Sequence, residues 1–291
     1  MISYSSRSVV ERAQPWLGTL VSIRVEGTCA SIAHNAIDAA FAEVATIHRL
    51  MSFHQEDSDV SRLNRLAATQ PVPVHPYTFV VLQHALDFSA RSGGCFDITV
   101  AGQLVDWGFL PKVEVGDYEP QGAWQDIELR TDGAVVYRSP VLLDLGGIAK
   151  GYAVDRATEV LLSHSVQQCV VNAGGDMRVV GQQTERVILD RGFPSSDLPV
   201  VELRNGSLAS STGQGKIKWH EGKELGPHVH GNSRLPVPTD RFVSVLAERC
   251  IVADALTKVV LAEGTNSRQL LQQFGASAHI YDPFGGWGTI E

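Results

Sequence analysis

Residues 144–156 read DLGGIAKGYAVDR, and this stretch carries the densest structural and chemical signal in the chain. The apolar residues before it predict a buried strand over Val141–Leu145, and the period-3.6 pattern after it predicts a helix over Ala149–Leu162. Gly146 and Gly147 separate the two elements and predict a tight turn. A strand that passes through glycines into a helix fixes the local fold around which the rest can be placed.

The same turn is a candidate anion site. The N-terminus of a helix presents free backbone N–H groups and the positive end of the helix dipole, and both attract phosphate. Lys150 adds a positive charge there, and Asp144 can accept a hydrogen bond from a ligand hydroxyl or ring N–H. The spacing matches neither a Walker loop nor a dinucleotide fingerprint. Phosphate binding and a purely structural turn therefore both remain open from spacing alone.

Outward from this stretch, strands and helices interleave without the regular rhythm of repeated strand-helix-strand units. The pattern predicts strands over Thr19–Val25, Asp126–Leu129, Ala134–Tyr137, Cys169–Asn172, Met177–Val180, Val187–Leu189 and Val200–Leu203, with helices over Ser31–Arg49, from Pro76 to Gly93, and over Ala253–Ala262. Such an order favours a mixed α+β fold, with sheets flanked by helices, over a doubly wound parallel sheet.

The composition of the chain excludes some classes of function. The 291 residues carry a net charge of −8, which argues against binding to nucleic acid backbones. The sequence shows no signal peptide and no apolar run that could span a membrane, so a cytoplasmic protein is expected. We expect residues 1–15 to form an N-terminal extension and 16–291 a single domain, with a possible sub-boundary in the turn-rich region 111–122. Four scattered cysteines predict reduced, mostly buried thiols.

Residues 144–156 also resemble the central signature of the FAD:protein FMN transferase family, also called ApbE, and further segments agree in order. These are Leu17-Gly18-Thr19, Met51-Ser52-Phe53 with Ser58, Ser61, Leu63 and Asn64, Phe96–Val100 with Leu104-Val105 and Trp107-Gly108-Phe109, Val171–Asp176, and Ala253–Leu256. The resemblance spans roughly residues 16 to 264.

The resemblance implies a T-fold-related α+β architecture with a ligand cleft between two lobes. It implies an enzyme that binds FAD and Mg²⁺, moves FMN to a Ser or Thr hydroxyl of a partner flavoprotein, and releases AMP. Some relatives instead hydrolyse FAD, so an FAD pyrophosphatase is an alternative. A flavin-nucleotide binding protein with a degraded metal site is another.

The resemblance also implies roles for single residues. The flavin and adenosine cleft would involve Met51, Phe53, Asp97 and Trp107, and cofactor contacts would extend to Gly146, Gly147, Ala149 and Lys150. Asp144 and Lys150 would lie beside the ligand, and His228 would be the candidate base. The metal ligands map onto the Ala149 carbonyl, the Asp254 carboxylate and a side chain four residues further on.

The sequence departs from the family pattern at that last position. The family usually has Thr there, whose hydroxyl suits Mg²⁺, whereas this chain has Lys258 and places Thr257 one residue early. Asp254 and Lys258 stand at the i,i+4 spacing of a helical ion pair. Either the Lys258 ammonium occupies or neutralises the metal site, or Lys258 points away and Thr257 or water completes it.

A second departure affects the loop after His228. The family has Asp-Pro and Thr-Gly in this loop, and this chain has neither. His230 is an additional imidazole two residues beyond His228, so on a strand both would share a face and could reach one ligand. An exposed, unremarkable pair of histidines is the alternative.

Overall fold

The computed structural model describes residues 9–113, 120–192, 198–214 and 216–291. An eight-stranded sheet forms its centre, and every neighbouring pair of strands in it is antiparallel. In spatial order the strands are β1 (Val9–Trp16), β2 (Thr19–Glu26), β6 (Cys169–Ala173), β7 (Asp176–Val180), β10 (Gly206–Thr212), β13 (Phe242–Ala247), β14 (Ser277–Asp282) and β15 (Gly286–Ile290).

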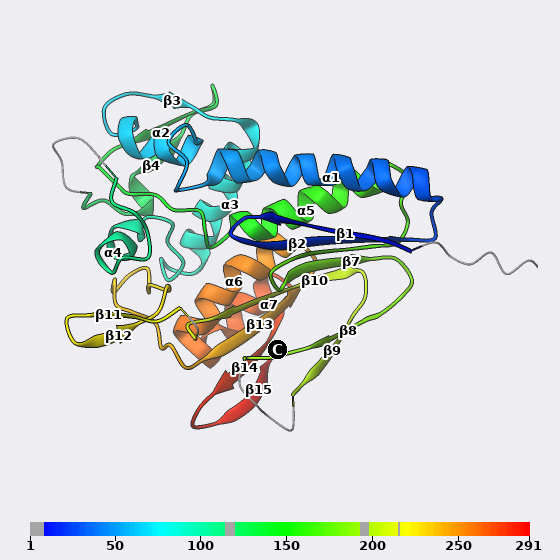
Figure 1. Cartoon of the computed structure of the whole chain (residues 1–291). Coiled ribbons are helices and arrows are strands. Elements are labelled where there is room, and N and C mark those ends of the chain that lie inside the picture. Colours follow the sequence, from blue (N-terminus) through cyan, green and yellow to red (C-terminus); the bar gives the residue numbers. More distant parts are fainter. Residues whose placement is uncertain (1–8, 114–119, 193–197, 215) are drawn as a thin grey trace, which may run out of the picture.

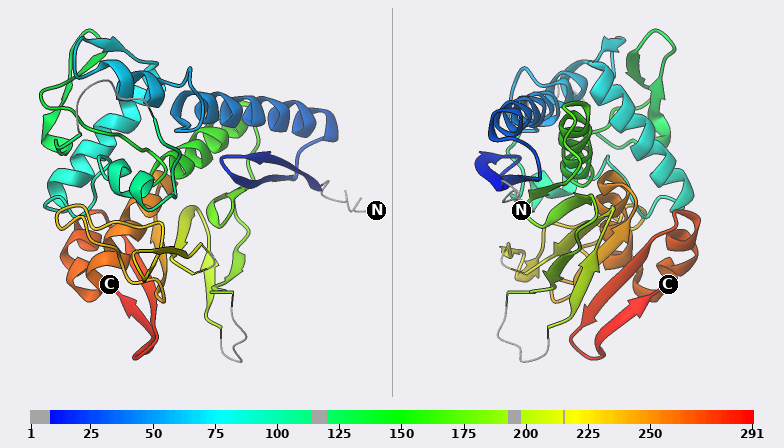
Figure 2. Two further views of the ribbon diagram at one scale, coloured as in Figure 1. Left: turned by 60° about the vertical axis from the view of Figure 1, so that its left-hand side comes forward. Right: turned by 90° about the vertical axis from the view of Figure 1, so that its right-hand side faces the viewer.

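Helices cover one face of this sheet (Figures 1 and 2). They are α1 (Ala30–Met51), α5 (Ala149–Ser163), α6 (Cys250–Glu263) and α7 (Arg268–Gln273). Alternation along the strands explains the two faces, because Val243 and Val245 pack with the helices while Phe242 packs on the other side. On that other side lies the hairpin of β8 (Glu185–Ile188) and β9 (Val200–Leu203).

A smaller part of the chain lies beyond the end of α1, at the upper left of Figure 1. It contains α2 (Asp59–Leu66), α3 (Pro76–Arg91), α4 (Ala101–Asp106) and a three-stranded sheet of β3 (Val72–Pro73), β5 (Ala134–Tyr137) and β4 (Ile127–Leu129). Two short 3-10 helices span Trp124–Asp126 and Gly264–Ser267, and β11 (Lys218–His220) pairs with β12 (Lys223–Leu225). One hydrophobic core cluster joins this part to α6 and β13.

The strand expected over Val141–Leu145 is wrong. These residues are mostly buried as expected, but they form no strand. The Asn64 side chain instead makes both backbone bonds of Leu143, accepting from its N–H at 2.7 Å and donating to its carbonyl at 2.9 Å. The Asp144 N–H donates to the Ile98 carbonyl at 2.9 Å. Side-chain and loop partners therefore replace a strand partner. The other expected strands and helices are present, with ends shifted by a few residues.

Residues 9–15 of the expected N-terminal extension form most of β1, which pairs along the whole of β2. Residues 114–119, which fall within the expected sub-boundary at 111–122, lie outside the described residues, so the division into domains stays a prediction. Among the helices that the structure describes, none is both long and apolar enough to cross a membrane.

The contact between α5 and α6 rests on the buried carboxylate of Asp155. It accepts hydrogen bonds from the N–H groups of Cys250 and Ile251, both at 3.0 Å, and so caps the start of α6. Arg178 on β7 donates to the same carboxylate at 2.7 Å. One side chain thus ties two helices and the sheet together.

Replacing Asp155 with Ala should destabilise the fold by about 3 to 5 kcal/mol, because it leaves Arg178 and two helix N–H groups without their acceptor. Urea unfolding followed by circular dichroism measures the change. Asp38→Ala is the matched control, since it removes a carboxylate from the exposed Arg12 pair and should cost less than about 1 kcal/mol. Equal losses in the two variants would contradict this account of the helix contact.

Candidate functional site

The departure at position 258 is visible in the geometry. The Lys258 ammonium forms an ion pair with the Asp254 carboxylate through Oδ1. Its Nζ also lies 3.0 Å from the Asp254 carbonyl oxygen, 3.0 Å from Thr257 Oγ1 and 3.2 Å from Ser211 Oγ. We call these four oxygen atoms the oxygen cluster. Lys258 therefore does not point away from Asp254 but occupies the centre of the cluster.

A second lysine lies beside the first pair. Lys150, on the first turn of α5, forms an ion pair with the buried Asp176 of β7, and its Nζ lies 3.9 Å from Asp254 Oδ1. The other Asp254 oxygen, Oδ2, accepts from the N–H of Gly151 at 2.9 Å. Both ends of the Asp254 carboxylate are thus bound, one by lysine and one by the first turn of α5.

The two lysines keep Asp254 ionised. Burial alone would raise the pKa of Asp254, but Lys150 and Lys258 outweigh it and lower that pKa below its ordinary value. Burial would likewise lower the pKa of Lys150, but Asp254 and Asp176 raise it above its ordinary value. Burial and the neighbouring carboxylate of Asp254 raise the pKa of Asp176. The result is an alternating row of positive and negative groups at the start of α5.

The oxygen cluster has the chemistry of a magnesium site, since carboxylate, carbonyl and hydroxyl oxygens are the ligands that this cation takes. Its centre, however, is filled by the Lys258 ammonium, which is a cation and no ligand. Thr257 Oγ1 is engaged as well, since it donates to the Asp254 carbonyl at 2.7 Å and bonds Ser211 Oγ at 2.8 Å. As arranged, these residues do not fit a bound Mg²⁺ ion.

The glycine turn lies against this cluster. A Cβ atom placed on Gly147 would lie 3.5 Å from Lys258 Cε and 3.7 Å from the Phe96 ring. The Ile148 side chain at the N-cap of α5 makes no capping hydrogen bond, and the Asp254 carboxylate instead accepts from the Gly151 N–H in the first turn at 2.9 Å. The Asp144 carboxylate folds back on the turn and accepts from the Gly146 and Leu145 N–H groups, while burial raises its pKa.

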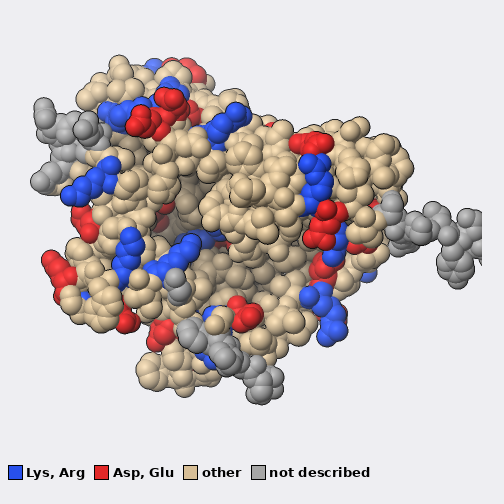
Figure 3. Space-filling model, viewed as in Figure 1, with Lys and Arg blue, Asp and Glu red and all other residues tan. Residues whose placement is uncertain are grey.

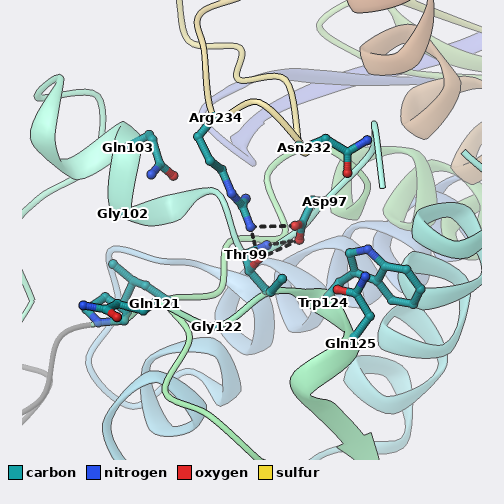
Figure 4. Close-up of a pocket in the computed structure, with 14 residues that line it drawn as sticks. Asp97, Thr99, Gly102, Gln103, Gln121, Gly122, Trp124, Gln125, Asn232 and Arg234 are labelled. Carbon is teal, nitrogen blue, oxygen red and sulfur yellow. Dashed lines mark hydrogen bonds and ion pairs between the residues drawn. The ribbon is translucent and has the colours of Figure 1, made fainter. Parts of the chain in front are cut away.

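A pocket of about 490 Å³ opens between α4, residues 120–125 and the loop that follows β12 (Figure 4). Polar side chains dominate its wall, among them Asp97, Thr99, Gln103, Trp124, Asn232 and Arg234. Figure 3 shows a hollow on one face of the molecule, with Lys and Arg side chains along its lower edge. The pocket and the hollow offer room for a ligand with both polar and aromatic contacts.

Arg234 is the most unusual residue of the pocket wall. Its Nη2 donates to Asp97 Oδ2 at 2.8 Å and to Thr99 Oγ1 at 3.0 Å, as Figure 4 shows. Nη1 is buried and has no hydrogen-bond partner among the residues described. The backbone of Arg234 is left-handed, with φ +57°. A residue of the pocket wall thus combines a strained backbone with a buried donor that has no partner among the described residues.

His228 begins the loop that carries Arg234. Its Nε2 lies 3.3 Å from the Thr212 carbonyl, which can only accept, so Nε2 carries the proton and Nδ1 is the free acceptor. Burial and the Lys258 ammonium lower the pKa of His228 to about 3. The imidazole is therefore neutral at physiological pH, the form required of a base. His230 does not join it, because its Nε2 bonds Glu263 Oε1 at 2.9 Å instead.

The remaining predicted residues fall into two groups. Ala149 and Lys150 open α5 beside Asp254, and Asp97 lines the pocket. Met51 and Phe53 are buried in the hydrophobic core, and Trp107 at the end of α4 is partly exposed. Their ligand contacts stay predictions.

Motif reasoning selected none of Arg234, Asn232, Gln103 and Trp124. Arg234 lies where the family loop changes, and that departure was the only available signal. Three of the four cysteines are buried and all four are free thiols, as expected.

Comparison with known proteins agrees with this picture. The chain is 26% identical to the FAD:protein FMN transferase of Treponema pallidum, over 90% of this chain and 81% of that protein. It is 28% identical to the protein of the same name from Rhodobacter capsulatus, over 85% of this chain but only 50% of that longer protein. The crystal structure of the ApbE protein from Thermotoga maritima superposes with a TM-score of 0.82, at 26% identity, over 98% of this chain and 97% of that one.

These similarities confirm the mixed α+β architecture that the sequence predicts. The sequence profile of the ApbE family matches residues 17–280, which include the glycine turn, both lysines and the pocket loop. The chain therefore belongs to the ApbE family.

Proposed function

We propose that this protein binds FAD and transfers its FMN moiety to a Ser or Thr hydroxyl of a partner flavoprotein, with release of AMP. The observation that carries the proposal is the pair of largely buried ammonium groups, Lys150 and Lys258, beside the start of α5 in a chain of the ApbE family. Transfer of a phosphoryl group needs positive charge at the pyrophosphate and an oriented hydroxyl. The two lysines and the α5 dipole supply the positive charge.

In this proposal the chain's own lysine takes the place that Mg²⁺ holds in the resemblance. Lys258 sits at the centre of the oxygen cluster, so its charge is available without a bound cation. An ammonium donates hydrogen bonds to phosphate oxygens, but it cannot hold two of them in one coordination sphere as a metal does. We therefore propose little Mg²⁺ dependence and slow transfer.

His228 is proposed as the group that accepts the hydroxyl proton, through Nδ1. A base with a pKa of about 3 holds a proton weakly, and Lys258 is the main charge that lowers this pKa. A pyrophosphate bound next to Lys258 would offset that charge and raise the pKa of His228. Substrate binding would then strengthen the base at the moment when it is needed.

The Lys258 ion pair also favours a second candidate function, a flavin-nucleotide binding protein that has lost transfer. One experiment separates the candidates. The purified chain is incubated with FAD and a flavoprotein acceptor, with and without Mg²⁺, and the products are analysed by mass spectrometry. An acceptor that gains the mass of FMN supports transfer. Free FMN and AMP with an unmodified acceptor indicate hydrolysis, and intact bound FAD indicates a binding protein. A cytoplasmic location and the identity of the acceptor stay predictions.

Replacing Lys258 with Thr should create Mg²⁺ dependence, because it restores a hydroxyl four residues from Asp254 on the same helix face. Calorimetry should show tighter Mg²⁺ binding, and FAD cleavage should rise when Mg²⁺ is added. Lys223→Thr, an exposed lysine on β12, is the matched control and should change neither quantity. Strong Mg²⁺-dependent transfer by the unmodified chain, unchanged in Lys258→Thr, would show that Lys258 has no part in the site.

The same substitution should raise the pKa of His228, since it removes the ammonium whose charge lowers it. Burial remains, so the pKa should stay below the ordinary value for histidine. Nuclear magnetic resonance of the imidazole through a pH titration measures this directly and without FAD. A His228 pKa that is equal in Lys258→Thr and Lys223→Thr would contradict the proposed coupling.

Replacing Arg234 with Gln should weaken FAD binding about tenfold or more, because the pocket wall loses the guanidinium that Asp97 and Thr99 hold in place. Gln keeps a side chain at the left-handed position, so the backbone strain is unchanged. Arg138→Gln serves as the control, because it removes an exposed arginine that directly follows β5. Fluorescence titration with FAD gives both affinities, and equal values would remove Arg234 from the site.

A further inference from the structure

A second group of chemically reactive side chains lies outside the oxygen cluster. Cys95, from the loop after α3, His230, from the loop after β12, and Glu263, at the end of α6, place their ligand atoms within 4.8 Å of one another. Within the described part of the chain this is the one such group of three or more His, Cys, Asp or Glu residues. The proposed function uses none of the three.

We propose that Cys95, His230 and Glu263 form a binding site for a thiophilic divalent cation of the zinc class. A thiolate, an imidazole nitrogen and a carboxylate oxygen are the ligand types that Zn²⁺ takes. A single carboxylate beside a thiol suits Mg²⁺ or Ca²⁺ poorly, because those cations prefer several oxygens. This site is independent of FAD and of the metal position near Asp254.

The spacing suits a tetrahedral ion. With bonds of about 2.0 to 2.3 Å to the metal, ligand atoms of a tetrahedral site lie about 3.5 Å apart. The present separations of up to 4.8 Å therefore need only small side-chain adjustments. Three protein ligands leave the fourth position for water. The side chains of His230 and Glu263 are 24% and 35% exposed, which provides a path for the ion from solvent.

The backbone already holds two of the ligands in place. The Gly231 N–H donates to the Cys95 carbonyl at 2.9 Å, and the Asn232 amide donates to the Gly93 carbonyl at 2.8 Å. A Cβ atom on Gly231 would lie 2.0 Å from the Gly94 carbonyl oxygen, so only glycine permits this approach. A site whose ligands come from rigidly placed backbone loses little entropy when the ion binds.

Binding of the cation changes which atoms of Cys95 and His230 carry protons. Without the ion, burial and Glu263 raise the pKa of Cys95 to about 12, so the thiol is protonated. The His230 Nε2 proton faces Glu263, and the Ser233 N–H approaches Nδ1 at 3.4 Å. Binding releases the thiol proton and moves the imidazole proton from Nε2 to Nδ1, which gives up the long Ser233 contact. The cation then replaces the hydrogen bonds that Cys95 and His230 each make to Glu263.

A bound ion would fix the position of the loop that follows β12 and lines the pocket. His230 lies four residues before Arg234, and the turn between them also carries Asn232, so a bound ion would tie the pocket wall to the end of α6. The family pattern has Asp-Pro and Thr-Gly in this loop, whereas this chain has the extra imidazole. In this reading the ion is structural and stabilises the loop.

The test uses the full chain carrying Cys29→Ser, which removes the exposed thiol so that it cannot bind metal. After chelation, the protein is titrated with Co²⁺ without oxygen, and absorbance reports any bond between cobalt and sulfur. We expect one equivalent with a near-ultraviolet thiolate charge-transfer band that Zn²⁺ abolishes by displacement. No band in this parent protein would overturn the proposal.

Variants assign the ligands. Adding Cys95→Ser should remove the band, and His230→Gln or Glu263→Gln should weaken metal binding by at least about 100-fold. His34→Gln, an exposed histidine on α1, is the matched control and should leave affinity unchanged. Zn²⁺ should raise the thermal midpoint of the parent but not of His230→Gln. Should Cys95→Ser fail to fold, the two Gln variants decide the question. Affinity equal to the parent in both of them would mean that the three side chains form only a hydrogen-bonded group.

Discussion

The close contact between α5 and α6 at Gly151 is the constraint on which the site depends. A Cβ atom at Gly151 would lie 2.4 Å from the Cys250 carbonyl oxygen and 2.8 Å from Asp254 Cβ, so any larger residue would force the helices apart. The contact lets the Gly151 N–H reach Asp254 and lets Asp155 cap α6. Because both helices also pack on the sheet, their approach fixes the positions of Lys150 and Lys258 beside Asp254.

Positive and negative side chains alternate in this contact. Each largely buried lysine has its own carboxylate, Asp176 for Lys150 and Asp254 for Lys258. Burying a single charge without a partner is costly, whereas paired charges with further hydrogen bonds are tolerated. In the proposed function, an anionic ligand beside this row would meet lysines whose positions are already fixed, and it would compete with Asp176 and Asp254 for their ammonium groups. The affinity for phosphate would then depend on the folding of the helix pair.

Periodicity predicted most of the fold because the amphipathic patterns are local. The α1 helix and the β2 strand follow directly from apolar residues at spacings of three to four and of two. Val141–Leu145 shows the limit, since a buried apolar run can be held by a side chain such as Asn64 instead of a neighbouring strand. Family motifs pointed to Asp254 and Lys258, but Arg234 could not be found in this way. Its importance comes from a long-range approach to Asp97, 137 positions away in the chain.

The left-handed backbone of Arg234 is held in place by the ion pair of its side chain with Asp97. A non-glycine residue at φ +57° stores about 1 to 3 kcal/mol of strain, and glycine would adopt the same conformation without it. Glycine would relieve that strain, but it would also leave the buried Asp97 carboxylate without its guanidinium partner, which costs about 3 to 5 kcal/mol. The ion pair with Asp97 therefore outweighs the strain and keeps an arginine in a conformation that otherwise suits glycine. Efforts to make this protein more robust, for structural work or as a reagent, should hold that residue fixed and seek stabilising changes elsewhere.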